Sequence, residues 1–144
     1  MKFWKSFSKA AVLKQLFFVL ALFAVLIPIA IWDSNTQIST EFGADNVSIR
    51  SDKYTITIPY SDIAAAELTD LAEPGEKMTE GFDNDIIRVG LWKNDVWGEY
   101  YINADLDTTN CILVTLNDGR KFVFSKKDDR ATEKMYTQLL TYLK

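Results

Sequence analysis

A β-hairpin is predicted by residues 111–125, which read Cys111-Ile-Leu-Val-Thr-Leu-Asn-Asp-Gly-Arg-Lys-Phe-Val-Phe-Ser125. Two runs rich in β-branched and aromatic residues flank an Asp-Gly pair, the strongest short hairpin signal, because glycine adopts a positive φ without strain. The only cysteine of the chain, Cys111, stands in the first run. We expect it to be a small buried strand residue rather than a reactive thiol.

Further strands are predicted upstream of this hairpin, where apolar and polar residues alternate in short runs. The expected strands are 47–50, 54–58, 61–69, 86–92 and 97–104, and the alanine triplet in 61–69 could instead be helical. A long loop is expected between them, over 71–85, because Pro74-Gly75 and Gly81 lie there among several acidic residues. With the hairpin, seven strands are expected.

After residue 128 the apolar residues change to a helical period. The spacing i, i+3, i+4, i+7 is kept by Thr132, Met135, Tyr136, Leu139, Leu140 and Leu143, and Asp128 or Asp129 can cap the first turn. We therefore expect a mainly β domain with one capping helix, its seven strands forming a barrel or a pair of packed sheets whose open end the C-terminal helix closes. Its core should be built around Ile56, Ile58, Val89, Leu91, Ile112, Val114, Phe122 and Phe124.

The N-terminal part of the chain has a different composition. Residues 1–32 contain four lysines and no acid, whereas the other 112 residues hold 12 basic and 20 acidic side chains. Residues 16–32 form an uncharged run of 17 residues, close to the length that spans a bilayer. This pattern predicts a transmembrane signal anchor over 10–32, and a cleaved signal peptide is the alternative that stays open.

Four segments follow from this reading. All four early lysines precede the apolar run. The positive-inside rule therefore predicts a single-pass protein of the cell membrane, with residues 1–9 as a cytoplasmic tail and the acidic domain on the outside. Residues 33–45 are polar and are expected to be a short linker that keeps the domain, residues 46–144, close to the bilayer.

Composition excludes several classes of function. The chain has no histidine and one cysteine, which rules out a histidine-based catalytic pair, an imidazole metal ligand and a multi-thiolate site within it. A net charge of −4 argues against a nucleic-acid partner. The acidic pairs 83/85 and 105/107 lack the spacing of a calcium loop. We therefore expect no enzyme activity, no catalytic residues, no cofactor and no metal.

Four segments of the domain resemble the bacterial pleckstrin-homology-like (PH-like) domain families, and together they fall within residues 46–144. They are Ile58-Pro-Tyr-Ser-Asp-Ile63, Arg88-Val-Gly-Leu-Trp92, Trp97-Gly-Glu-Tyr-Tyr-Ile102 and the hairpin from Ile112 to Ser125. The resemblance implies a seven-stranded PH-like barrel or sandwich with a C-terminal helix, often attached to membrane helices. It implies no catalytic residues, and its usual inference is a binding or scaffold module.

Two groups of residues are candidates for the binding surface: the aromatic residues Trp92, Trp97 and Tyr100, and the basic residues Arg120, Lys121, Lys126 and Lys127. Aromatic rings could stack on a ligand and the basic cluster could meet an anionic surface. The alternatives are cross-strand packing for the first group and a solvated surface for the second. We thus expect a binding module for a protein or an anionic envelope polymer. An accessory subunit that acts through its transmembrane helix is the alternative.

Overall fold

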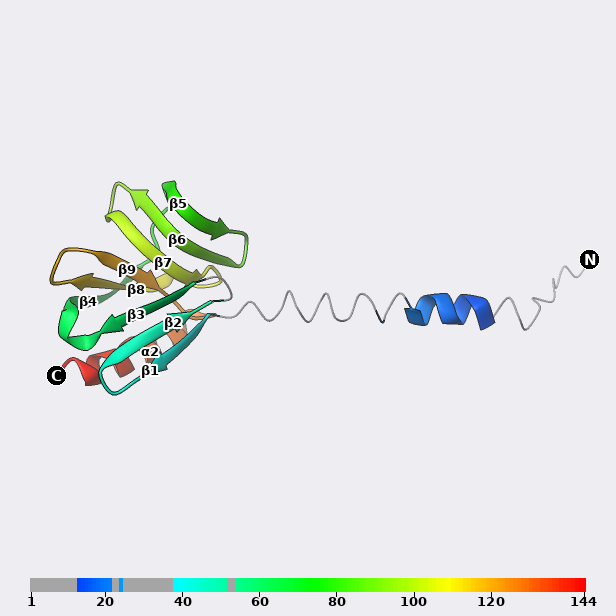
Figure 1. The fold of residues 1–144 in the computed structure, drawn as a ribbon, viewed down its shortest axis with the longest axis horizontal. Coiled ribbons are helices and arrows are strands. Elements are labelled where there is room, and N and C mark those ends of the chain that lie inside the picture. Colours follow the sequence, from blue (N-terminus) through cyan, green and yellow to red (C-terminus); the bar gives the residue numbers. More distant parts are fainter. Residues whose placement is uncertain (1–12, 22–23, 25–37, 52–53) are drawn as a thin grey trace, which may run out of the picture. The chain divides into compact units, whose positions relative to one another are not determined.

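The structure is a computed structural model that describes residues 13–21, 24, 38–51 and 54–144 (Figure 1). The chain divides into two units, Met1–Asn35 and Thr36–Lys144. In the first unit, residues 13–21 and 24 are helical. The described residues contain no helix both long enough and apolar enough to span a bilayer. The remainder of the predicted anchor, 10–32, and the predicted tail, 1–9, lie outside the described residues.

The second unit is mainly β and ends in a helix, which confirms this part of the predicted fold class. Its described residues form nine strands, one 3-10 turn (η1) and one long helix. In chain order they are β1 (Ser39–Phe42), β2 (Asn46–Arg50), β3 (Thr55–Pro59), η1 (Tyr60–Asp62), β4 (Ile63–Asp70), β5 (Glu76–Asp83), β6 (Ile87–Asn94), β7 (Gly98–Asp105), β8 (Asn110–Leu116), β9 (Lys121–Phe124) and α2 (Asp129–Tyr142).

The first three strands form an antiparallel sheet in the order β1-β2-β3. β2 and β3 correspond to strands that the sequence predicts. β1 lies inside the stretch 33–45, which we expected to be a linker, so the folded unit begins before residue 46. This strand is held by pairing with β2, where Thr40 lies opposite Ile49 and Phe42 opposite Val47.

The other six strands form a second sheet in the order β4-β8-β9-β7-β6-β5, in which β7 and β9 are parallel and all other neighbours antiparallel. The predicted hairpin is confirmed as β8 and β9, and Gly119 in its turn has a φ of 88°. The prediction of a loop over 71–85 is wrong, because β5 occupies most of that range and pairs with β6.

The two sheets do not close into a barrel. β4 and β5 lie at opposite edges of the six-stranded sheet, and β1, β2 and β3 pair only with one another. At η1 the chain passes from the smaller sheet into the larger one (Figure 1). The expectation of a seven-stranded barrel is therefore wrong in strand number and in closure, while its alternative of two packed sheets holds.

One face of the six-stranded sheet carries the main core. Residues from this face are buried together with residues of β2, β3 and α2, in a cluster that contains Val47, Ile49, Ile58, Ile87, Val89, Ile112, Val114, Leu116, Phe122, Phe124, Met135 and Leu139. Of the predicted core residues, Ile56 and Leu91 are only partly buried. α2 contacts β8 and β4, and buried Asn103 of β7 donates to the backbone oxygen of Ile49 in β2 at 3.3 Å. Helix and small sheet thus cover the same face.

The opposite face is covered in part by the connection from β4 to β5, residues 71–75, which we call the strap. Because its two strands lie at opposite edges, the strap crosses this face, and Leu71 and Ala72 pack on a second buried cluster. The Tyr100 hydroxyl donates to the backbone oxygen of Pro74 at 2.7 Å, and the Asn94 amide donates to that of Glu73 at 3.0 Å. The large sheet is thus apolar on both faces.

Candidate functional site

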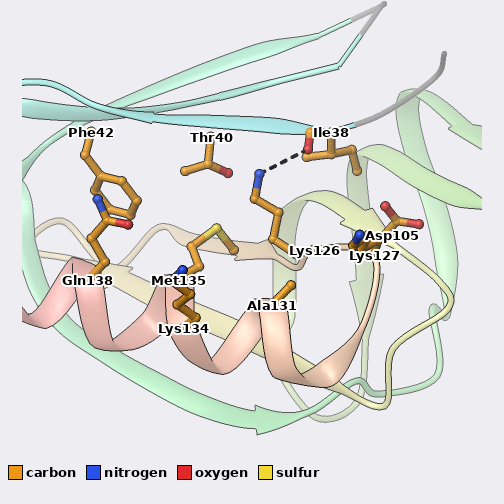
Figure 2. A pocket seen from close by; sticks show the side chains of 10 residues that line it. All are labelled: Ile38, Thr40, Phe42, Asp105, Lys126, Lys127, Ala131, Lys134, Met135 and Gln138. Atoms are coloured by element: carbon orange, nitrogen blue, oxygen red, sulfur yellow. Dashed lines mark hydrogen bonds between the residues drawn. The ribbon is translucent and has the colours of Figure 1, made fainter.

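A groove of about 510 Å³ lies between β1 and α2 (Figure 2). Its walls are the inward-facing side chains of β1, one face of α2, and the ends of the strands that precede the helix. The lining residues are Ile38, Thr40, Phe42, Asp105, Lys126, Lys127, Ala131, Lys134, Met135 and Gln138. Three lysines and a single acid therefore meet in one groove.

The start of α2 sets the position of the lysines that precede it. The Asp128 carboxylate accepts from the amide of Ala131 at 2.7 Å, which is an N-cap. The buried Thr132 hydroxyl accepts from the amide of Lys126 at 3.0 Å and donates to the backbone oxygen of Asp128 at 2.9 Å. These bonds fold the 126–128 segment back over the first turn, so that Lys126 and Lys127 border the groove.

β1 is attached to neighbouring elements at both ends of the groove. At one end, Lys126 Nζ approaches the backbone oxygen of Ile38 at 3.5 Å. At the other end, the Tyr142 ring of α2 stacks on Phe42, with centroids 5.4 Å apart, and on Tyr60, with centroids 5.0 Å apart. The groove is held open between these two attachments, so it is formed before any ligand binds.

The charges of the groove influence each other. Burial raises the pKa of the Asp105 carboxyl, Asp107 raises it further, and Lys126 lowers it. Burial lowers the pKa of Lys126, whereas Asp105 raises it. In the described ranges, ion pairs join Arg88 to Asp83 and Arg120 to Asp118, and neither pair involves a groove lysine. With three lysines and one acid in its lining, the groove therefore has a net positive charge.

A buried hydroxyl also points to a ligand. The side-chain oxygen of Thr40 is buried and has no hydrogen-bond partner in the described part of the chain. Figure 2 shows Thr40 across the groove from Met135 of α2. A buried polar atom without a partner is unfavourable, so this hydroxyl is a group that a ligand could satisfy.

The three aromatic candidates do not form an exposed surface. Trp92 and Trp97 are each 6% exposed and Tyr100 is 1% exposed, and all three belong to the cluster near the strap. The indole of Trp92 donates to the backbone oxygen of Val89 at 3.2 Å, and the rings of Trp97 and Tyr100 meet edge to face. Burial raises the pKa of Tyr100 to about 12. These contacts favour the packing interpretation over ligand stacking.

The four basic candidates separate into two places. Arg120 and Lys121 lie where β9 begins, and Lys126 and Lys127 lie after it ends. Five residues of extended chain span about 16 Å, so one compact ligand cannot reach both pairs. Arg120 is paired with Asp118 at 2.8 Å, and Lys121 Nζ donates to the backbone oxygen of Trp97 at 2.8 Å. Only the second pair borders the groove.

Sequence reasoning did not find the other residues of the groove. Lys134 and Gln138 lie three and seven positions after Ala131, so the helical period places them on one face with it. That signal was available in the sequence. The contribution of Thr40 was not, because it depends on a strand in the stretch that reads as a linker.

The described residues include no group of three or more acidic or cysteine side chains placed to hold a metal ion. Cys111 is fully buried, as predicted, and burial raises the pKa of its thiol to about 12. Comparisons of the chain with models of protein families, with curated proteins and with solved structures found no match.

Proposed function

We propose that this chain is a membrane-anchored, extracytoplasmic binding module that acts without catalysis and holds an anionic ligand in the groove between β1 and α2. The observation that carries the proposal is the meeting of Lys126, Lys127 and Lys134 around one preformed groove, where they form no ion pair within the described residues. Ammonium groups bind phosphate and carboxylate oxygens by charge-assisted hydrogen bonds. The ligand is then an anionic group of an envelope polymer, or of a protein, at the cell surface.

The PH-like relationship and the membrane anchor are parts of this proposal. Two packed sheets followed by a C-terminal helix support the first. The nine strands and the parallel pairing of β7 with β9 depart from the seven-stranded order that the resemblance implies. The charge difference between residues 1–32 and the remainder of the chain supports the second.

Phosphate binding to the full-length protein in phosphatidylcholine nanodiscs tests the proposal. We expect calorimetry to give a measurable affinity for inorganic phosphate that falls as salt is added, because salt screens exposed charges. The double substitution Lys127→Gln and Lys134→Gln should weaken binding by roughly two- to five-fold for each lysine, since an exposed charge contact is worth up to about 1 kcal/mol.

Two matched variants make this test specific. The double substitution Arg120→Gln and Lys121→Gln also removes two positive charges, but at the end of β9 that lies away from the groove. It should leave phosphate affinity unchanged. Asp105→Asn removes the single acid of the groove and should strengthen binding, because the carboxylate repels the anion. Equal weakening by both double substitutions, or no phosphate binding at all, would contradict the proposal.

A further inference from the structure

The groove changes in character along its length. Figure 2 shows Asp105 and Lys127 at one end, Lys126 near the middle where it reaches toward Ile38, and Phe42 with Gln138 at the other end. Between them the walls are made by Ala131, Lys134 and Met135 of α2 and by Thr40 of β1. Charge therefore lies at one end and along the middle, and the largest apolar side chains, Met135 and Phe42, lie toward the other end.

Several contacts fix the wall of the groove at the end where Phe42 lies. Phe42 stacks on Tyr142 with an interplanar angle of 8°, and the Tyr60 hydroxyl donates to the backbone oxygen of Gly43 at 3.1 Å. Met135, which is 4% exposed, forms the floor beside them. A flexible apolar chain that entered from the charged end would meet preformed walls here and would not have to open the protein.

The dimensions suit a chain of several carbon atoms. Four steps of extended strand from Ile38 to Phe42 span about 13 Å. Seven steps of helix from Ala131 to Gln138 rise about 10 Å. The two walls are thus of similar length, and the groove volume falls in the range that binds small molecules, roughly 300–1,000 Å³.

We infer that the ligand is a single-chain anionic amphiphile, with a phosphate or carboxylate head at Lys126 and Lys127 that can also accept from the Thr40 hydroxyl, and an alkyl chain along Met135 toward Phe42. This inference rests on the proposed function, because the head is the anionic group proposed above. A polyanion without an apolar part would use only the lysine end. The anchor predicted from the sequence would keep the domain beside a membrane, which is a source of such molecules.

A series of short alkyl phosphates tests the inference on the full-length protein in phosphatidylcholine nanodiscs. Inorganic, ethyl, butyl and hexyl phosphate are titrated by calorimetry, and empty nanodiscs correct for partition into lipid. We expect affinity to rise roughly two- to four-fold for each added methylene, because a fully buried methylene contributes about four-fold. Hexanol and hexyltrimethylammonium, which lack an anionic head, should bind far more weakly than hexyl phosphate.

Two substitutions in the groove wall should change, in opposite directions, the increase in affinity that the alkyl chain of the ligand provides. Ala131→Phe fills the groove and should abolish the gain while phosphate still binds. Gln138→Leu, at an exposed position, extends the apolar wall and should increase it. If Ala131→Phe does not fold, the second substitution and the chain-length series still decide.

The failure of this inference differs from the failure of the proposed function. If phosphate binds through the lysines but hexyl phosphate binds no more tightly, only the alkyl chain is refuted. Equal binding of hexyl phosphate and hexyltrimethylammonium would overturn the inference as well, because the protein would then not distinguish an anionic head from a cationic one. If phosphate itself does not bind, the proposed function fails first.

Discussion

Asp129 accepts four hydrogen bonds from residues 108–110, at the end of the β7–β8 loop and the start of β8, and these bonds hold the start of α2 in place. The donors are the hydroxyl groups of Thr108 and Thr109 and the backbone amides of Thr109 and Asn110. The hydrogen bond from Thr108, followed by that from the Asn110 amide, holds the pKa of the Asp129 carboxyl well below its usual range. The carboxylate form is therefore favoured in the folded protein.

The sign of the pH effect follows from this shift. Asp129 should stabilise the fold above the unfolded pKa of about 4, and this contribution should be lost as pH falls toward the lower folded pKa. Asp129→Asn should melt at a lower temperature than the wild type at pH 6, and the difference between the two melting temperatures should be smaller at pH 2. Asp128→Asn is the control, because asparagine is an equally good N-cap. A constant difference between wild type and Asp129→Asn at both pH values would contradict the role of this carboxylate.

Residue roles were predictable from the sequence only in part. Alternation predicted correctly that Cys111 is buried. It did not decide between packing and binding for Trp92 and Tyr100, which lie opposite each other in the β6–β7 register and so share a face. What covers that face is the strap, and the sequence alone does not show which surface an irregular segment crosses.

At the scale of elements, α2 was the clearest prediction and β1 and β5 were missed. The helical period of α2 is long, and its residues Thr132, Met135 and Leu139 are buried as expected. β1 has four residues, and β5 is mostly exposed along its length. Neither carries the apolar alternation of an independent strand, so each owes its conformation to pairing with a neighbour.

Leu139 connects the helix to the larger sheet. It is fully buried in the same cluster as Val114 of β8 and Phe124 of β9. Leu139→Ala should lower the free energy of unfolding by roughly 2–5 kcal/mol, the range for a truncated buried leucine, as measured by urea denaturation. Gln138→Ala, at an exposed neighbouring position, should change it by less than about 0.5 kcal/mol. A chain that ends at residue 127 should fail to fold, and a cooperative transition in that truncation would disprove the role of α2.

For the whole molecule, the prediction concerns orientation. Because the early lysines precede the apolar run, protease added to intact spheroplasts should digest the β domain and spare the N-terminal tail. Immunoblots with tags at the two ends measure this, and lysed spheroplasts are the control for access. Protection of residues 45–144 in intact spheroplasts would refute the orientation. A mature N-terminus near Ile31 would show instead that the segment is a cleaved signal peptide.

The place of β9 between β7 and β8 has a consequence for the order in which the sheet can assemble. β5, β6 and β7 follow one another in the chain and in the sheet, so their pairing closes only short loops. β4, in contrast, pairs with β8, which lies about 45 residues later in the chain. β8 is joined to β7 only through β9, which pairs with both. We expect the β5–β7 meander to form early and the β8–β9 hairpin to join it later, before β4 pairs with β8. Until that hairpin arrives, a nascent chain has no site where β4 can dock.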